Sequence, residues 1–231
     1  MQPEDLAAYQ ELRVGFTAAV SHELRTPLAR LAALLESASL PDAEVEPLLA
    51  QAREQVDEMS ELVDDVLFLS ELESGREVVA LAATRALPVL EAVRTRYAEN
   101  ALRADVRLAV AADPPDVTLP LRPRMLRVVA QNLVVNALRY AGPRSSFTLT
   151  ARLRDDGGVE LVAEDDGAGV DEEDLPRLFE RFFRSDRARA SRGTGLGLAI
   201  VKHVVTAAGG EVAATGGPGQ GLRVTCAFPA S

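Results

Sequence analysis

The sequence predicts a helical hairpin followed by an α+β domain, in which helices pack on a mainly antiparallel sheet. Up to residue 72, apolar residues recur at spacings of three and four, which is typical of helices with one apolar face. Beyond residue 76 the pattern changes to short alternating segments separated by glycine-rich turns, with helical segments between them. This change indicates two domains of different architecture.

The composition is that of a soluble globular protein. The chain has 231 residues, of which 47% are hydrophobic, enough for one large or two modest domains. Its formal net charge of -10 argues against general nucleic-acid binding, because a polyanion would be repelled overall. No apolar run reaches the roughly 18 residues of a membrane segment, and the single cysteine, Cys226, excludes an internal disulfide. We therefore expect a cytoplasmic chain, with Cys226 as buried strand filler.

The first predicted helix, residues 5–37, carries a histidine on its polar side. Its apolar face consists of Phe16, Val20, Leu24, Leu28, Leu31 and Leu35. At about 100 degrees per residue, His22 projects away from this face, with Glu23 beside it and Thr26 one turn later. Pro27 removes a helical hydrogen bond, so we expect a kink just beyond the histidine. A solvated polar residue is the alternative interpretation of His22.

The second predicted helix, residues 43–72, has a heptad pattern. Its seam consists of Leu49, Ala52, Val56, Met59, Val63 and Val66. The turn Ser39 to Asp42 is short, so the two helices should form an antiparallel hairpin. One hairpin leaves much of each seam in water, which predicts a homodimeric four-helix bundle. The alternative is a hairpin that packs on its own C-terminal domain.

The predicted domain boundaries follow the change in pattern. Residues 1–72 form the helical domain, residues 73–78 the linker and residues 79–231 the α+β domain. In the latter we expect helices over about 85–100, 123–140 and 195–208, strands over 106–111, 117–121, 147–153 and 159–163, an irregular stretch over 170–192, and a final hairpin. Its cluster Gly216 to Gly221 is interpreted as a turn rather than a phosphate loop, because strands flank it.

The helix over 123–140 has a polar side that suits a nucleotide. Its buried side is predicted to contain Leu126, Val129, Leu133 and Ala137. The other side presents Asn132, Asn136, Arg139 and Tyr140. An Asn amide oxygen is a hard ligand suited to magnesium, an arginine can bind phosphate, and a tyrosine ring can pack against a base. A merely solvated polar face is the alternative.

Two glycine-containing segments add further nucleotide-binding chemistry. Asp165 ends a strand and is followed by Gly167 and Gly169; the carboxylate can accept a hydrogen bond from an adenine amino group, while glycines allow close backbone approach. The run Gly193-Thr194-Gly195-Leu196-Gly197 opens a helix, where backbone N–H groups attract phosphate. Between these segments lie six arginines that suit a lid over a triphosphate: Arg177, Arg181, Arg184, Arg187, Arg189 and Arg192. An ordinary turn and a solvated loop are the alternatives.

Taken together, these segments resemble sensor histidine kinases. The sequence His22 to Leu28 is similar to the phosphoacceptor box of the His-Glu-x-x-Thr type. Gln131 to Tyr140 resembles the family's N box, Asp165 to Gly169 its first glycine box, Phe179 to Arg184 its F box, and Gly193 to Gly197 its second glycine box. Asp166 stands where Asn is common in relatives, and Ala168 where Pro is common.

The resemblance implies a fold of the GHKL or Bergerat type, in which ATP lies between a helical layer and a sheet. It implies that Asn136 coordinates Mg²⁺, that Asp165 binds adenine, and that Asn132 lies near the phosphates and the metal. It also places Tyr140 near the base and Arg184 near the γ-phosphate. The implied activity is autophosphorylation of His22 from Mg-ATP and transfer to an aspartate of a response-regulator receiver domain.

Two further expectations depend on this resemblance. Thr26 would position a hydrolytic water for dephosphorylation of the regulator, because a threonine hydroxyl is a poor general base. The chain would be either a short soluble kinase or the soluble part of a membrane-anchored one. Two other functions are alternatives to the histidine kinase. One is a conformational ATPase related to gyrase, chaperone and mismatch-repair ATPases, and the other is a non-catalytic dimerisation module. His22 with Thr26 argues against the first alternative, and the nucleotide boxes argue against the second.

Overall fold

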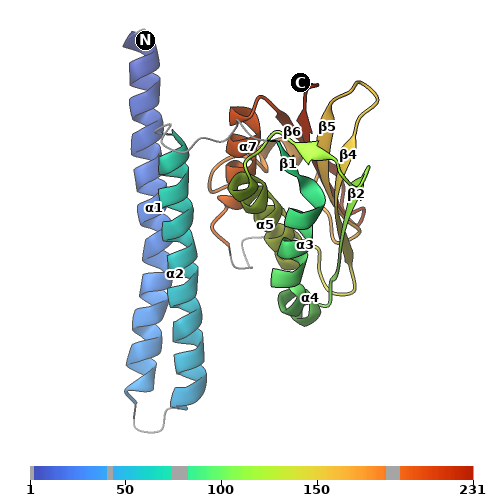
Figure 1. The fold of residues 1–231 in the computed structure, drawn as a ribbon. Helices are drawn as coiled ribbons and strands as arrows, with labels where there is room; N and C mark the ends of the chain where they lie inside the picture. The colour runs from blue at the N-terminus through green and yellow to red at the C-terminus, as the bar shows by residue number, and fades with distance from the viewer. Residues whose placement is uncertain (1–2, 41–43, 74–82, 186–192, 231) are drawn as a thin grey trace. The chain divides into compact units, whose positions relative to one another are not determined.

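The structure, a computed structural model, describes residues 3–40, 44–73, 83–185 and 193–230 (Figure 1). The chain forms two compact units, Met1–Phe68 and Leu69–Ser231, which are described separately below. Most of the predicted linker, residues 73–78, lies outside the described residues. The predicted domain boundaries therefore stay predictions.

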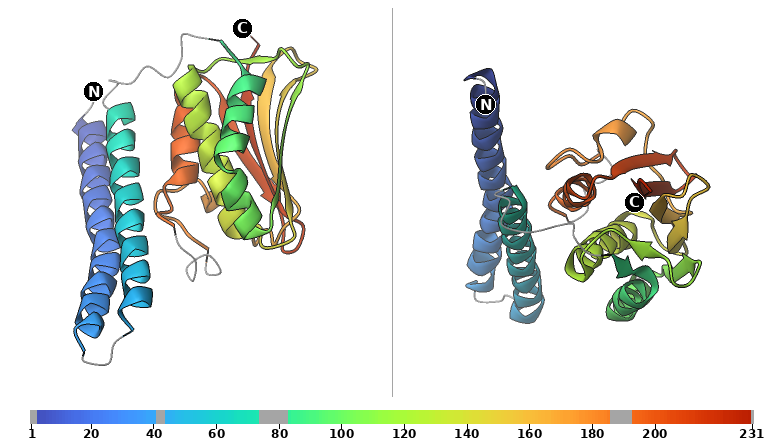
Figure 2. Two further views of the ribbon diagram at one scale, coloured as in Figure 1. Left: turned by 60° about the horizontal axis from the view of Figure 1, so that its bottom comes forward. Right: turned by 45° about the horizontal axis from the view of Figure 1, so that its top comes forward.

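The first unit is a helical hairpin. Helix α1 (Pro3–Ala38) and helix α2 (Val45–Glu73) lie side by side in all views (Figures 1 and 2). The predicted hairpin is therefore confirmed. Pro27 lies inside α1, which continues through it as helix, so the kink stays a prediction.

Apolar positions of the hairpin are exposed in the single chain. Leu28 and Leu35 of α1 are 51% and 53% exposed, and Val56 of α2 is 48% exposed. Leu49 and Val63, which share the heptad seam with Val56, are exposed as well. Leaving such a seam in water forgoes roughly 25 cal/mol for each Å² that a partner would cover. The surface is thus available to a partner helix pair.

The second unit is built on a five-stranded sheet. Its strands are β2 (Arg107–Asp113), β4 (Ser146–Leu153), β5 (Val159–Asp165), β6 (Glu211–Gly216) and β7 (Leu222–Phe228). They lie in the order β2-β4-β5-β7-β6, and every neighbouring pair is antiparallel except β2 and β4. The expected mainly antiparallel sheet is therefore present. A separate pair, β1 (Thr84–Arg85) with β3 (Thr118–Leu119), lies outside this sheet.

Helices cover one face of the sheet (Figure 2). They are α3 (Ala86–Arg96), α4 (Ala98–Ala104), α5 (Pro123–Tyr140) and α7 (Gly197–Ala207). The core between the layers contains Phe147 and Leu149 of β4 and Phe228 of β7, each at most 2% exposed. Burial raises the pKa of the Cys226 thiol to about 12, which fits its predicted place as buried strand filler. This two-layer α/β domain confirms the predicted fold class of the second part.

Three predicted elements differ from the structure. The helix expected over 85–100 is interrupted at Tyr97, whose ψ of 8° is not helical, so α3 and α4 are separate helices. The strand expected over 117–121 is reduced to the two residues of β3, which pair within the described residues with the two-residue β1. The irregular stretch over 170–192 contains a short 3-10 helix, η1 (Leu175–Arg177).

Candidate nucleotide site and phosphoacceptor helix

Helix α5 presents the polar residues that the sequence singles out. Proline at its first position favours the helix start, and the predicted apolar face is buried as expected. On the opposite side, Asn132, Asn136, Arg139 and Tyr140 are all half-buried. The Asn132 side-chain N–H donates to the Val128 carbonyl at 2.9 Å, which leaves its amide oxygen directed away from the helix backbone. This oxygen can therefore serve a ligand.

The glycine run 193–197 passes directly over these α5 side chains. A Cβ added at Gly193 would lie 2.7 Å from the Tyr140 hydroxyl oxygen and 3.5 Å from an Arg139 guanidinium nitrogen. A Cβ added at Gly197 would lie 2.7 Å from the Asn132 amide oxygen. The two 2.7 Å distances are closer than real Cβ contacts, so a side chain at either glycine would require the Tyr140 or Asn132 side chain to move, and Gly193 also has a φ of 147° that favours glycine. The structure thus brings two of the predicted segments together.

The same run opens helix α7. The N-cap residue, Leu196, has no side-chain group that caps the helix, and its N–H donates to Thr194 Oγ1 at 3.2 Å. Backbone N–H groups at such a start are unpaired within the helix and carry its positive dipole end. Thr194 and Leu196 are buried, which fixes the run in place. The arrangement suits an anion such as phosphate.

Asp165 lies at the end of β5 and is only 9% exposed. Its Oδ1 accepts the Gly167 N–H at 2.9 Å and the Leu222 N–H at 3.4 Å. Burial raises the pKa of this carboxyl above its ordinary value, although the two backbone donors act against the shift. A carboxylate held by one oxygen keeps its second oxygen for a ligand donor.

The loop after Asp165 packs on the C-terminal end of α5. A Cβ added at Gly167 would lie 2.2 Å from the carbonyl oxygen of Ala141, and the Ala168 N–H donates to that same carbonyl at 2.9 Å. These backbone contacts tie the loop after Asp165 to Ala141, the residue that follows Tyr140. The structure brings together α5, the loop after β5 and the glycine run, which together can hold a base and a polyphosphate.

The F-box segment is tied to the glycine run. The Phe182 N–H donates to the Gly195 carbonyl at 3.0 Å, and Phe182 adopts a φ of 62°. Arg177 lies 4.2 Å from the centre of the Phe183 ring. Arg184, the last residue of this segment, is half-buried. Arg187, Arg189 and Arg192 of the predicted lid lie outside the described residues.

His22 belongs to the helical unit. Its side chain is 76% exposed, as predicted for the polar side of α1, and Thr26 is exposed one turn later. The His22 Nδ1 lies 3.8 Å from Glu23 Oε1, too far for a direct hydrogen bond but close enough for electrostatic attraction. Nδ1 is therefore the ring nitrogen on the Glu23 side, and Nε2 is the other one.

Sequence reasoning missed the contacts that anchor Asp165 and its neighbour. Asp166 Oδ1 accepts the Ser146 N–H at 2.6 Å, and the Ser146 hydroxyl accepts from Arg107 at 2.8 Å. The donor from Leu222 was also unforeseen. These partners are far apart in sequence, so only the pairing of the strands could reveal them. The one available signal was the acidic run 164–166 at a strand end.

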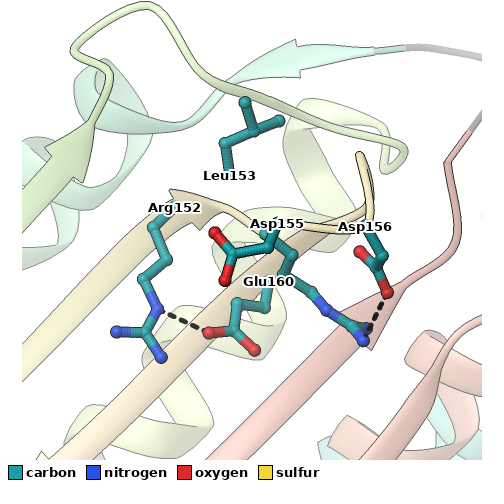
Figure 3. A pocket seen from close by; sticks show the side chains of 6 residues that line it. Arg152, Leu153, Asp155, Asp156 and Glu160 are labelled. Carbon is teal, nitrogen blue, oxygen red and sulfur yellow. Dashed lines mark hydrogen bonds and ion pairs between the residues drawn. The ribbon is translucent and has the colours of Figure 1, made fainter.

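A pocket lies at the opposite end of β5 and does not contribute to this site (Figure 3). It is lined by Arg152, Leu153, Arg154, Asp155, Asp156 and Glu160. Arg152 pairs with Glu160 at 2.5 Å, and Arg154 pairs with Asp156 at 2.7 Å. The two arginines are paired, and Asp155 adds a third carboxylate, so the pocket carries a net negative charge and offers no attraction to a phosphate group.

The donor set fits a magnesium ion that is shared with a nucleotide. No group of three or more His, Cys, Asp or Glu side chains gathers as a metal cage within the described ranges. The neutral amide oxygens of Asn132 and Asn136, one turn apart on α5, can supply hard oxygen ligands. Mg²⁺ in such sites takes its remaining ligands from phosphates and water.

The chain matches two family models. Residues 12–75 match the His Kinase A (phospho-acceptor) domain, and residues 122–231 match the histidine kinase-, DNA gyrase B- and HSP90-like ATPase. A phospho-acceptor helical domain joined to an ATPase domain of this type defines the class of two-component sensor kinases. ATP binding by the second domain follows from the same match.

Curated relatives of this chain are also sensor histidine kinases or sensor proteins. The sensor-like histidine kinase SenX3 of Mycobacterium tuberculosis is 36% identical over 98% of this chain and 56% of its own length. The phosphate regulon sensor protein PhoR of Pseudomonas aeruginosa is 36% identical over 95% of this chain and 50% of its own length. This chain belongs to the sensor histidine kinase family. It spans about half the length of these curated relatives.

Solved structures share the fold. The Acinetobacter baumannii histidine kinase AdeS aligns over 90% of this chain and 97% of its own, with a TM-score of 0.72 and 25% identity. Full-length ShkA in complex with AMPPNP aligns over 99% of this chain and 46% of its own, with a TM-score of 0.66 and 29% identity. ThkA in complex with the response regulator TrrA aligns over 96% of this chain and 64% of its own, with a TM-score of 0.76 and 20% identity.

Among the described helices, none combines the length and the apolar character that crossing a bilayer requires.

Proposed function

We propose that this chain is a histidine kinase core that transfers the γ-phosphoryl group of Mg-ATP to His22. The observation that carries the proposal is a pairing within one chain. An exposed helical histidine in a His-Glu-x-x-Thr sequence accompanies an ATPase domain in which α5, the Asp165 loop and the glycine run meet. The chain thus contains both a domain suited to hold the phosphoryl donor, ATP, and a histidine suited to accept the phosphoryl group. In this proposal, the phosphoacceptor domain consists of residues 1–72 and the ATP-binding domain of residues 79–231. Residues 73–78 form the linker between them.

The roles of the ATP-site residues follow from their chemistry. Asp165 accepts from the adenine amino group, and the Tyr140 ring packs near the base. The glycine run and the α7 N-terminus bind phosphate oxygens through backbone N–H groups. Arg139 and Arg184 add positive charge near the polyphosphate, and Asn132 and Asn136 supply oxygen ligands for Mg²⁺. When bound, the metal screens the charge on the phosphate oxygens.

The transfer step requires a neutral His22 ring with a lone pair on the attacking nitrogen. Glu23, near Nδ1, favours the tautomer with the proton on Nδ1, which leaves the lone pair on Nε2. The Nε2–phosphorus bond forms as the bond between the γ-phosphorus and the bridging oxygen breaks. ADP leaves with that electron pair, and the Nδ1 proton passes to Glu23 or water.

We further propose that phosphorylated His22 serves as donor to an aspartate of a response-regulator receiver domain. Its exposure on the side of a helix leaves room for a docked protein. ThkA has been solved with its response regulator TrrA, and it shares the fold of this chain. Thr26, one turn from His22, is proposed to position water for dephosphorylation of that partner.

The hairpin is proposed to act as a homodimer. The exposed seam that includes Leu49, Val56 and Val63 is complementary to a second copy of itself, since apolar heptad seams pack on one another. Two hairpins then form a four-helix bundle that displays His22 of each subunit. We place this core in the cytoplasm, where ATP is available, either free or attached to a membrane-anchored sensor.

Incubation with γ-labelled ATP tests the proposal against its alternative, a conformational ATPase. A kinase core leaves label on the protein that is lost in acid and kept in base, as expected for a phosphorus–nitrogen bond. Release of free phosphate with no label on the protein would instead identify an ATPase. If the protein neither bound nor hydrolysed ATP, both enzymatic functions would be excluded, and a non-catalytic dimerisation module would be the remaining interpretation.

A further inference from the structure

The glycine turn between β6 and β7 contacts the backbone of Asp165. The pairing of β5 with β7 ends at Glu164 and Arg223, yet the two chains stay in contact beyond it. The Gly221 N–H donates to the Gly167 carbonyl at 3.1 Å, and the next N–H, of Leu222, donates to the Asp165 carboxylate at 3.4 Å. Adjacent residues of the turn thus support both the backbone and the side chain of the Asp165 loop.

The contact at Gly221 leaves no space for a side chain. Gly221 has a φ of 74°, and a Cβ added there would lie 1.8 Å from the carbonyl oxygen and 2.7 Å from the carbonyl carbon of Asp165. The obstructing atoms are backbone, which cannot rotate away as a side-chain tip can. Any residue larger than glycine must therefore displace the Asp165 peptide.

A second close contact joins the same two segments. A Cβ added at Gly169 would lie 1.9 Å from the Gly217 carbonyl oxygen, and the Gly219 N–H donates to the Ala168 carbonyl at 2.7 Å. The turn therefore follows the loop from Asp165 to Gly169 along its length. Glycines on both sides permit this approach.

We propose that Gly221 is a positioning residue for the base-reading carboxylate of Asp165, and that the turn it ends tunes selectivity for adenine. This inference rests on the proposed function, because it assumes that Asp165 binds the adenine amino group. Gly221 does not touch the nucleotide. It acts by fixing the peptide that carries the Asp165 side chain, since small displacements of a hydrogen-bonding group weaken recognition steeply.

The test compares binding of ATP and inosine triphosphate to the full chain by calorimetry. Inosine triphosphate has a carbonyl oxygen where adenine has its amino group, so only ATP has a hydrogen-bond donor at that position for Asp165. The wild-type protein should prefer ATP by about tenfold or more, the range of a hydrogen bond to a charged group. Gly221→Ala should lower this preference toward unity, mainly through weaker ATP binding.

Gly219→Ala is the matched control. Gly219 has a φ of 72°, so alanine there meets the same backbone strain, but its added Cβ would have no atom within 4 Å. Gly209→Ala, at a φ of 78° and also in open space, repeats the control outside the turn. Both variants should keep the wild-type preference for ATP. A general loss of stability would instead weaken both nucleotides alike in all three variants.

The possible outcomes distinguish a failure of the proposed role of Asp165 from a failure of the proposed role of Gly221. A wild-type protein with no preference for ATP would remove Asp165 as the base reader and this inference with it. A wild-type preference that survives in folded Gly221→Ala would overturn the inference alone. Should Gly221→Ala fail to fold, amide hydrogen exchange of the wild-type protein decides: ATP should slow exchange at Gly221 and Leu222 more than inosine triphosphate does, and equal protection would contradict the proposal.

Discussion

Asp165 and Asp166 are consecutive residues whose carboxylates lie in opposite electrostatic surroundings. Asp165 is buried, and desolvation raises its pKa above the ordinary value of 3.8. Asp166 is exposed, and the hydrogen bond from the Ser146 N–H lowers its pKa below that value. One residue is proposed to bind the base, whereas the other anchors the loop to β4. The two should therefore respond to substitution and to pH with opposite signs.

Asp165→Asn should stabilise the domain without nucleotide at pH 7 while weakening ATP binding. Because the folded pKa is raised, the contribution of this group to stability is fully present below pH 3.8 and is lost as pH rises through the folded pKa. The ionised carboxylate thus costs stability at neutral pH, and asparagine can still accept from Gly167. Thermal unfolding from pH 3 to 8 should show a gain of a few degrees that disappears at the acid end. A loss of stability at pH 7 would contradict this assignment.

Asp166→Asn should behave in the opposite way. A lowered folded pKa means that the stabilising contribution is present above pH 3.8 and is lost as pH falls through the folded pKa. The variant should therefore be slightly less stable than wild type at neutral pH and equal to it in strong acid. The same unfolding series measures both variants, and identical pH profiles for the two would refute the difference in environment.

Asn136→Ala should strongly weaken metal-dependent nucleotide binding without unfolding the domain. The substitution removes one oxygen ligand from an ion held by few protein groups, so ATP affinity at ordinary Mg²⁺ should fall by about 10- to 100-fold. Binding titrations with and without EDTA measure the effect. Gln131→Ala, beside the N-box asparagines, is the matched control. Unchanged Mg²⁺ dependence would exclude Asn136 from the site.

Val56→Asp should dissociate the proposed dimer. A carboxylate at this seam position would be buried without a partner between two hairpins, which costs several kcal/mol for each ion. Light scattering should show dimers for wild type and monomers for the variant. Gln51→Asp adds the same group at an exposed position outside the seam and should stay dimeric. A monomeric wild-type protein would leave the seam without its proposed partner.

Thr26→Ala should separate two activities on one helix. Autophosphorylation and transfer should stay largely intact, because the hydroxyl does not take part in either step. Dephosphorylation of a phosphorylated regulator should slow by about tenfold or more if the hydroxyl orients the attacking water. Time courses with purified phosphoregulator measure it. Equal loss of all activities would point to a structural role beside Pro27, and no loss would remove Thr26 from the mechanism.

Local periodicity was sufficient to predict much of the fold. The helical hairpin, the buried face of α5 and the strand pair around the Asp155 to Gly158 turn follow from spacings of three to four or of two, which are local properties. The break at Tyr97 was missed because nothing in its flanking residues signals a helix end. The parallel pairing of β2 with β4 was not predicted either, since it depends on strand order.

For the candidate site too, local features were predictable from the sequence and long-range contacts were not. The polar side of α5, Asp165 and the glycine run were recognisable as separate segments, because each has its own chemistry at short spacing. Their assembly was expected only from family resemblance. The bond from Ser146 to Asp166 and the contact of Gly221 with Asp165 link strands far apart in sequence, and no local pattern encodes such register.

The central claim is that His22 accepts the phosphoryl group, and its most direct test is labelling of the wild type, His22→Gln and His203→Gln with γ-labelled ATP. His203, in α7, is the only other histidine of the chain and serves as the matched control. We predict acid-labile label on wild type and His203→Gln, none on His22→Gln, and nucleotide affinity within about twofold for wild type and His22→Gln, because the proposed ATP-site residues are unchanged. Retained label on His22→Gln would show that the acceptor lies elsewhere and would contradict the account.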